Sequence, residues 1–466
     1  MVPERLQRVL AAVAPLAERL AAAGHRAYLV GGAVRDALLD VEHQGDLDVT
    51  TDARPPEIKR ILEGWADAIW TQGEAFGTIG CSREGQAFEI TTHRAEAYAA
   101  DSRKPEVRFG DAVEDDLARR DFTVNAMALE VIPEPRLVDP HGGTADLAAG
   151  RLRTPLAPHE SFSDDPLRMM RAARFIARFG LEPDPDLVEA VEAMADRLEI
   201  VSPERIRDEL DKLIVVDDPS PGLWFLVRTG LAQQFLPELP ALGLEQDPIH
   251  RHKDVLAHTL AVVANVGPGA VMDRPVDLRI TRLAALFHDV GKPKTRSIGP
   301  DGVSFHHHEV VGARMARDRM RALRYSNDDI EAVSALVYLH LRFHTYQMGW
   351  TDKAVRRYVR DAGALLPELN VLTRCDCTTR NKSKATALNR RIDELERRIA
   401  ELREQEELDA IRPDLDGRQV MEHLGIPPGP VVGEALDMLL EARLEEGPLG
   451  EEEACRRLDG WWAARG

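Results

Sequence analysis

The sequence predicts an α+β protein with a small mixed-sheet head and a helical remainder. Between about residues 26 and 131, the short apolar runs AYLVGG, DLDVT, GTIGCS and AFEITT alternate with helical stretches such as VRDALLD and PPEIKRILEGW. From about residue 156 onward the pattern is almost purely helical. The chain has 466 residues, which is too many for one core, so we expect several domains.

We expect four parts along the chain. These are a head (1–150), a helical neck (151–245), a helical body rich in His and Asp (246–385) and a helical tail (386–466). The N-terminal stretch reads as an amphipathic helix without the apolar core of a signal peptide. Residues 390–408 form a charged helix with heptad-like apolar positions, for which packing within the chain is favoured over a dimerising coil.

The composition bears on nucleic-acid binding, on membrane insertion and on the cellular compartment. The net charge of −19 argues against binding nucleic acid through overall charge, but it allows a local basic groove, and Arg residues cluster in RMMRAARFIAR at 168–178. The sequence contains no run of about 18 apolar residues, so it predicts no membrane span. The four cysteines form no CxxC pair, which favours a reducing cytoplasm. The oligomeric state stays open.

Two features of the head point to nucleotide chemistry. Gly31 and Gly32 lie between a predicted strand and a helix, where glycine lets the backbone approach a phosphate, although a tight turn alone explains them equally well. Asp46 and Asp48 are two apart on a predicted strand, so they face the same way and repel each other unless a cation binds. Such a pair suits Mg²⁺ in a two-metal nucleotidyl transfer. Glu89 either adds a third carboxylate or is an outward-facing strand residue.

The order of four motifs resembles the class II tRNA nucleotidyltransferases and bacterial poly(A) polymerases. They are GGAVRD, DLDVT, RRDFTVNAM at 119–127 and DDPLRMMRAARF at 164–175, and the resemblance covers about residues 28–213. Asp164 stands where the family usually has Glu. The resemblance implies that Arg35 contacts the triphosphate, that Arg120 contacts the nucleotide, and that Asp121 and Asn125 hold the sugar or shape the pocket.

Hydrogen-bond chemistry predicts which bases the site accepts. Asp165 and Arg168 are three apart on a predicted helix, so both face the same way. Asp accepts and Arg donates, which matches the amino donor and ring-nitrogen acceptor of cytosine and adenine. Guanine and uracil reverse that pattern, which is costly when buried. The alternative for Asp165 and Arg168 is an exposed salt bridge on a helix. Arg171 and Arg174 continue this face, and the resemblance implies that they reach the base or triphosphate.

The body contains a second constellation. His258, then His288 and Asp289, then Asp376 occur in the order found in HD-type phosphohydrolases, which they resemble. Imidazole and carboxylate ligands together hold a divalent metal of unknown identity. His308, Glu309 and either His340 or His344 are further candidates for a second metal.

These observations predict CCA addition to the tRNA 3′ end from CTP and ATP, with Mg²⁺ in the head. Poly(A) addition, CC-only addition and A-only addition share the same motifs. The bacterial poly(A) polymerases that the chain resembles often carry a basic C-terminal extension, whereas this tail is acidic, with LEEGPLGEEEA, and the segment LDGRQVMEHLGIPPGP resembles the tail of HD-containing tRNA nucleotidyltransferases. The resemblance therefore favours tRNA. From other classes of protein, a phosphohydrolase with an RNA-binding head and a non-catalytic RNA scaffold are both disfavoured by the intact carboxylate pair.

Overall fold

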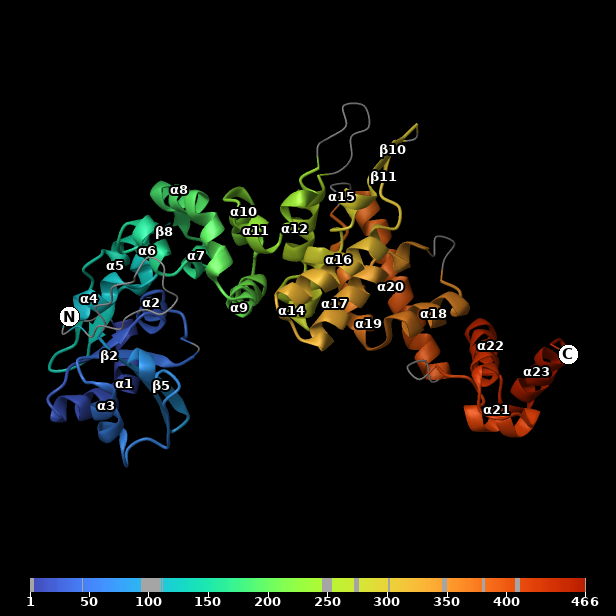
Figure 1. The fold of residues 1–466 in the computed structure, drawn as a ribbon, viewed down its shortest axis with the longest axis horizontal. Helices are drawn as coiled ribbons and strands as arrows, with labels where there is room; N and C mark the ends of the chain where they lie inside the picture. Colours follow the sequence, from blue (N-terminus) through green and yellow to red (C-terminus); the bar gives the residue numbers. More distant parts are fainter. Residues whose placement is uncertain are drawn as a thin grey trace. The chain divides into compact units, whose positions relative to one another are not determined.

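The computed structural model separates into two compact units (Figure 1). The first comprises residues 1–216 and 221–235, and the second comprises 217–220 and 236–466. The residues that the structure describes are 4–43, 45–93, 110, 112–244, 254–271, 276–300, 302–345, 350–378, 382–406 and 411–465. The prediction of four parts is finer than this division and stays a prediction.

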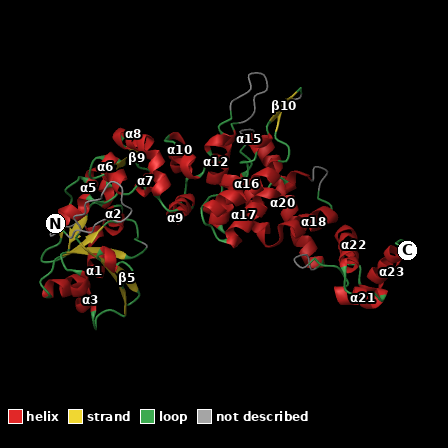
Figure 2. Cartoon of the chain, viewed as in Figure 1, coloured by secondary structure: helices red, strands yellow, loops and turns green. Residues whose placement is uncertain are grey.

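A seven-stranded mixed sheet forms the head, in the order β3-β4-β5-β2-β1-β6-β7. Its strands are β1 (Ala27–Val30), β2 (Leu47–Thr51), β3 (Ala68–Trp70), β4 (Thr78–Arg83), β5 (Gln86–Thr92), β6 (Ala128–Glu130) and β7 (Arg136–Val138). Strands β2 and β5 pair in parallel, and the other neighbours are antiparallel. The predicted α+β class with a mixed sheet is confirmed, and Figure 2 shows how few strands lie outside the head.

The two faces of this sheet have different coverings. One face packs against α1 (Glu4–Ala22), α2 (Gly32–Leu38) and α3 (Pro55–Leu62), and it holds the main apolar core of the head. On the other face, the short helix α4 (Val113–Ala118) packs with apolar residues of β1, β6 and β7. Because side chains alternate along a strand, Asp48 and Thr50 of β2 and Glu89 and Thr91 of β5 point to this second face. That part of the sheet carries the candidate site.

The helices that follow the sheet complete the first unit. They are α5 (Gly143–Ala149), α6 (Pro158–Asp164), α7 (Leu167–Phe179), α8 (Pro185–Met194), α9 (Pro203–Ile214), α10 (Ser220–Arg228) and α11 (Leu231–Phe235). A two-stranded pair, β8 (Arg151–Leu152) with β9 (Glu182–Pro183), links the start of this region to the end of α7. Helix α7 packs on α9, which places the polar faces of both helices beside the head.

The second unit is helical except for the hairpin β10 (Ser297–Gly299) and β11 (Gly302–Ser304). Its helices are α12 (Val255–Asn265), α13 (Pro268–Val271), α14 (Leu278–Phe287), α15 (Lys292–Thr295), α16 (His308–Ala322), α17 (Asn327–Leu339), α18 (Asp352–Ala362), α19 (Leu366–Cys375), α20 (Lys382–Gln405), α21 (Gly417–Leu424), α22 (Pro430–Glu446) and α23 (Glu451–Ala463).

Helix α20 contains the heptad-like segment. Its apolar positions Ile392, Leu395, Ile399 and Leu402 are buried within the chain, where the helix contacts α18 and α19. The expected packing within the chain is therefore confirmed as far as Gln405, and residues 407 and 408 lie outside the described residues. None of the described helices combines the length and the apolar character that a bilayer crossing requires.

Candidate active site and metal centre

The turn between β1 and α2 requires glycine at its first position. Gly31 has a φ of 72°, in the region that residues with a side chain rarely adopt. A Cβ atom on Gly31 would lie 2.9 Å from Nη1 of Arg120 and 3.5 Å from Oδ2 of Asp48. The backbone conformation therefore selects glycine, and the turn brings the ends of the Arg120 and Asp48 side chains against the main chain.

Three carboxylates gather beside this turn. Asp48 on β2 is in register with Glu89 on the parallel strand β5, so their side chains share a face. Burial raises the pKa of Asp48, and burial together with the charges of Asp48 and Asp46 raises the pKa of Glu89. Asp46 lies one residue before β2, which begins at Leu47, so the prediction that it belongs to the strand is wrong by one residue. The mutual repulsion of these carboxylates is what a divalent cation relieves.

A cavity of about 380 Å³ opens next to Asp48. It brings together every residue predicted for nucleotide binding: Gly31, Gly32, Arg35, Arg120, Asp121, Asn125, Asp165, Arg168, Arg171 and Arg174. It also includes four residues that the sequence did not single out: Arg119, Leu167, Phe175 and Arg205. Guanidinium groups dominate the lining despite the acidic net charge, which suits a polyphosphate ligand.

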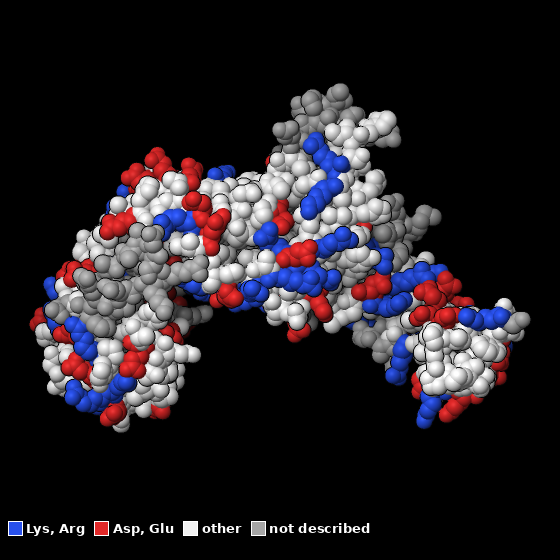
Figure 3. All heavy atoms as spheres, in the orientation of Figure 1, with Lys and Arg blue, Asp and Glu red and all other residues white. Residues whose placement is uncertain are grey.

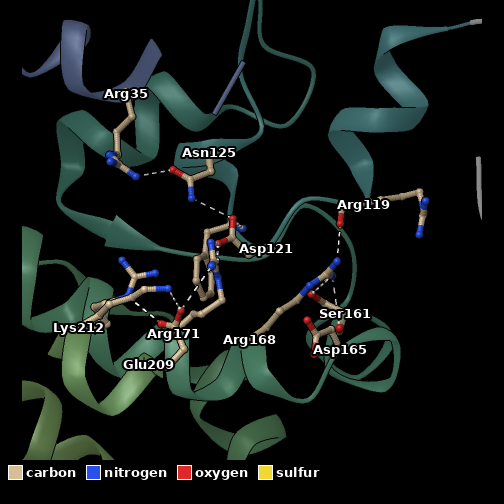
Figure 4. A network of polar contacts seen from close by, with 12 residues as sticks. Arg35, Arg119, Asp121, Asn125, Ser161, Asp165, Arg168, Arg171, Glu209 and Lys212 are labelled. Atoms are coloured by element: carbon tan, nitrogen blue, oxygen red, sulfur yellow. Dashed lines mark hydrogen bonds and ion pairs between the residues drawn. The ribbon is translucent and has the colours of Figure 1, made fainter. Parts of the chain in front are cut away.

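A chain of polar contacts joins the head to the neck across the floor of this cavity (Figure 4). Nη1 of Arg35 donates to Asn125 Oδ1 (2.6 Å), and Nδ2 of Asn125 donates to Asp121 Oδ1 (3.0 Å). Nε of Arg171 on α7 donates to Asp121 Oδ2 (2.9 Å), and Arg171 also lies 3.7 Å from Glu209 on α9. Burial acts to raise the pKa of Asp121, but Arg171 and Asn125 outweigh it and hold that pKa well below its usual range.

Two of the arginines predicted to bind the nucleotide, Arg35 and Arg174, make most of their contacts within the protein. Arg35 is 5% exposed, donates twice to Asp36 and stacks on the ring of Phe179 at 4.2 Å. Arg174 is 8% exposed, and its Nε donates to Glu209 at 2.8 Å. Both border the cavity, and their main contacts shape its wall.

The base-selecting pair is arranged differently from the prediction. Asp165 has an extended backbone between α6 and α7, so it does not share a helix with Arg168. The physical reason is Pro166, because the residue before proline is driven out of helical conformation. Both side chains nevertheless border the same cavity. Arg205 on α9 donates to Asp165 Oδ2 (2.8 Å), and Arg168 donates to Ser161 Oγ (2.8 Å).

A second cavity of about 340 Å³ also borders Asp48. It shares Asp48, Arg119, Arg120 and Arg168 with the first cavity, and it extends along the sheet to Val30, Val49, Thr78, Glu89, Thr91 and Asp116. Asp48 therefore borders two spaces, one lined mainly by guanidinium groups and one lined largely by carboxylates and strand threonines.

The four predicted ligands of the body lie together in the second unit. His258 belongs to α12, His288 and Asp289 follow α14 directly, and Asp376 follows α19 directly. Nε2 of His258 lies 2.9 Å from Asp376 Oδ1 and 3.6 Å from Asp289 Oδ2. Nε2 of His288 lies 3.3 Å from Asp289 Oδ2. His258, His288 and Asp289 form a set of three whose ligand atoms lie within 4.8 Å of one another.

Asp289 also belongs to a second set of three, with His308 and His340. Its Oδ1 lies 3.4 Å from Nε2 of His308, while its Oδ2 faces the first set. One carboxylate thus bridges the two sets, an arrangement suited to two metal ions. Of the further candidates, Glu309 and His344 belong to neither set within the described part of the chain.

The hydrogen bonds of these histidines fix where their protons lie. Nδ1 of His288, His308 and His340 faces the backbone carbonyl three residues earlier at 2.6–2.7 Å, so each Nδ1 carries the hydrogen. A neutral ring then presents a lone pair at Nε2. Nε2 of His288 lies 3.4 Å from that of His258, and Nε2 of His308 lies 3.3 Å from that of His340. Burial lowers the pKa of His340 to about 3, so this ring is neutral. Facing lone pairs and carboxylates fit a bound metal cation.

Comparisons with known proteins agree with both sites. Family profiles described as "Poly A polymerase head domain", "Probable RNA and SrmB- binding site of polymerase A" and "HD domain" match residues 27–153, 180–242 and 255–381. The A-adding tRNA nucleotidyltransferase of Deinococcus radiodurans is 35% identical over 449 residues, which are 94% of this chain and 95% of that protein. The chain belongs to the tRNA nucleotidyltransferase family.

Other relatives of this tRNA nucleotidyltransferase carry a different name. The CCA-adding enzyme of Bacillus velezensis is 40% identical over 234 residues, which are 50% of this chain and 56% of that protein. The crystal structure of the Bacillus stearothermophilus CCA-adding enzyme in complex with CTP matches 100% of this chain and 99% of its own, with a TM-score of 0.72 and 25% identity. The Thermotoga maritima enzyme complexed with tRNA shares the fold, with a TM-score of 0.59 and 19% identity.

Two functional candidates in this tRNA nucleotidyltransferase were missed at the sequence level. Arg205 and Glu209 lie on α9, which packs on α7; Arg205 lines the cavity, and Glu209 is buried behind it, where it pairs with Arg174. The sequence carries a weak signal for them: a charged stripe on an amphipathic helix that starts after Ser202 and Pro203. Such a stripe is usually a solvated face, so only the packing of the two helices distinguishes these residues.

Asp121→Asn should lower the free energy of unfolding by about 2 kcal/mol at neutral pH, because Arg171 loses the charge-assisted hydrogen bonds to its nearer carboxylate and is left with the more distant carboxylate of Glu209, at 3.7 Å. The depressed pKa of Asp121 means that its contribution is present above the unfolded pKa of about 3.9 and is lost as the pH falls through the folded pKa. The difference between variant and wild type in urea unfolding should therefore shrink below about pH 4. A difference that stays constant with pH would contradict the pairing. Exposed Asp115→Asn is the matched control.

Replacing His288 and Asp289 together by Ala should remove a bound transition metal from the second unit while nucleotide addition persists, because the head carboxylates belong to the first unit. The measurement is metal content after dialysis against Mn²⁺ or Ni²⁺, with Glu309→Gln as the control. Unchanged metal content would refute the centre. Loss of nucleotide addition in a folded double variant would show that the two sites are coupled.

Proposed function

We propose that this tRNA nucleotidyltransferase adds CMP and AMP from CTP and ATP to the tRNA 3′ end without a nucleic-acid template and so completes the CCA sequence. The observation that carries the proposal is the position of Asp48 between two cavities. The guanidinium-lined cavity suits a nucleoside triphosphate, and the second cavity, along the sheet, leaves room for an RNA 3′ end. The names of the relatives and the CTP complex of a solved neighbour support this assignment.

The reaction follows from this placement. The acceptor 3′-hydroxyl oxygen forms a bond to the α-phosphorus, the bond from that phosphorus to the β-phosphate oxygen breaks, pyrophosphate leaves, and the hydroxyl proton passes to solvent. Arg120 and Arg168 border both cavities, so they are placed to pair with phosphates on either side of the reacting atoms. Holding both reactants beside Asp48 makes the step effectively unimolecular.

Asp46, Asp48 and Glu89 would hold Mg²⁺ in the head. The fit rests on their mutual repulsion and on the carboxylate oxygens that Mg²⁺ prefers. When bound, Mg²⁺ neutralises the triphosphate and activates the attacking hydroxyl. The protein supplies the register of β2 and β5, which sets Asp48 and Glu89 side by side.

Base selection is assigned to Asp165 and Arg168. An Asp acceptor beside an Arg donor matches the pairing edges of cytosine and adenine and mismatches those of guanine and uracil. Arg205 holds the carboxylate of Asp165 from α9, so it orients the acceptor.

A-only addition is the second candidate. The observation in its favour is that the relative matching nearly the whole chain is an A-adding enzyme, whereas the Bacillus velezensis CCA-adding relative matches about half of it.

For the second unit we propose a divalent metal centre held by His258, His288, Asp289 and Asp376, with His308 and His340 beside a second ion. Such a centre activates water for phosphoester hydrolysis when loaded. The four cysteines are free, in keeping with work in the cytoplasm.

The direct test offers the purified protein three RNAs: tRNA lacking CCA, tRNA ending in CC and an unrelated RNA, each with every labelled triphosphate. CCA addition predicts C, C and A on the first and A on the second. A-only addition predicts extension of the second alone, and extension of all three with ATP would indicate poly(A) synthesis.

Asp48→Asn should abolish addition with Mg²⁺ present, while exposed Asp115→Asn should retain it. A fully active Asp48→Asn variant would overturn the site.

Asp165→Ala should reduce discrimination against UTP and GTP by roughly tenfold or more, because wrong bases no longer face an unsatisfied acceptor. The measurement is the ratio of kcat/KM values for CTP and UTP on the same acceptor. The control is Asp164→Ala, because Asp164 is the last residue of α6 and lies next to Asp165 in the sequence. An unchanged ratio would place base selection elsewhere.

A further inference from the structure

We propose that Trp70 forms a stacking platform for the last base of the RNA acceptor and so positions the acceptor 3′-hydroxyl beside Asp48 and Glu89. The inference rests on the proposed function, because it assigns the acceptor to the cavity along the sheet. It adds a positioning residue on β3, the edge strand of the head sheet.

The register of four adjacent strands carries the argument. Asp48 on β2 pairs with Glu89 on β5, Glu89 pairs with Gly80 on β4, and Gly80 pairs with Trp70 on β3. Residues in register on neighbouring strands point to the same face, so the two carboxylates and the indole form one row. With strands about 4.8 Å apart, the Cα of Trp70 lies roughly 10 Å from that of Glu89.

Gly80 lets the indole lean along this row. A Cβ atom on Gly80 would lie 1.8 Å from Nε1 and 2.2 Å from Cε2 of Trp70, so the ring occupies the space that a side chain on β4 would fill. The ring therefore extends from the edge strand across β4 in the direction of β5 and Glu89. Only glycine at this position permits that approach.

Core packing does not account for the indole. The preceding residue, Ile69, is in register with Cys81 and Phe88, whose side chains belong to the apolar core on the opposite face. Trp70 points away from that core and is 36% exposed. Phe76, which is 50% exposed, lies at the other end of the turn that follows β3. Two exposed aromatic residues thus flank one turn at the edge of the sheet.

The chemistry of the neighbouring cavity identifies the ligand as RNA. Arg119, Arg120 and Arg168 line the cavity along the sheet and suit backbone phosphates, while its carboxylates face the reacting hydroxyl. An aromatic ring beside such a groove stacks any base, because every base has a π-face. This tolerance matches an acceptor whose terminal base changes with each nucleotide added. Figure 3 shows acidic and basic side chains interspersed on the visible face.

The test measures the terminal base directly. An acceptor tRNA carries 2-aminopurine, whose fluorescence changes on stacking, as its last base, and it is titrated with the full-length protein without triphosphate. Wild type and Trp70→Phe should change the fluorescence, and Trp70→Ala should not. Ile69→Ala, on the same strand but on the opposite face, is the matched control and should behave as wild type.

Kinetics then separate stacking from a structural role. Trp70→Ala should raise KM for the acceptor at least fivefold and leave KM for CTP unchanged. An acceptor whose last residue is abasic should raise the KM of the wild type by a similar factor. It should not raise the KM of Trp70→Ala any further, because the ring and the base form one contact. Independent losses, or a fluorescence change that survives in Trp70→Ala, would overturn the platform. A fluorescence change that depends on Trp70 in a protein that adds no nucleotide would keep the platform and refute the proposed function.

Discussion

The ion pair between buried Asp121 and partly buried Arg171 is the interaction on which the candidate site depends. It joins the turn after α4 to helix α7, and through Asn125 and Arg35 it reaches α2. Many guanidinium groups around one cavity would repel each other if all were unpaired. Buried carboxylates neutralise the inner ones, since Asp36, Asp121 and Glu209 pair with Arg35, Arg171 and Arg174. Arg120 and Arg205 at the cavity wall pair with Asp116 and Asp165, and Arg119 and Arg168 also line the wall, where a triphosphate supplies further negative charge.

The sheet determines where the chemistry takes place. Helices α1, α2 and α3 bury one face, and α4 packs with β1, β6 and β7 on the other. The second face over β2 and β5 is left to polar residues, and the pairing of those two strands sets Asp48 beside Glu89. Arg120, which follows α4, and Asp48 both lie against Gly31 in the turn after β1. The division of the sheet into a covered half and a polar half therefore produces two cavities with Asp48 between them.

Local patterns predicted most of this site, and tertiary packing supplied the rest. The glycine turn and the Asp48 strand were each readable from neighbouring residues, the 119–125 segment was assigned from its resemblance to a family motif, and the cavity gathers all three. Asp165 was placed on a helix although the following Pro166 is a direct signal against it. The short strands β3, β6 and β7 have three residues each, too few for an alternating pattern. Arg205 and Glu209 were out of reach, because their role depends on how α9 packs against α7. In the second unit, the order of His and Asp predicted the first set of ligands, whereas the bridging position of Asp289 needed the fold.

The most direct test of the central role of the Asp121–Arg171 pair is a thermodynamic cycle on CTP binding. Calorimetry would compare wild type, Asp121→Asn, Arg171→Met and the double variant, each first shown to be folded. If the pair shapes the cavity as one unit, each single variant loses a similar amount of CTP affinity and the double variant loses little more. Independent, additive losses, or unchanged affinity in either single variant, would contradict this account.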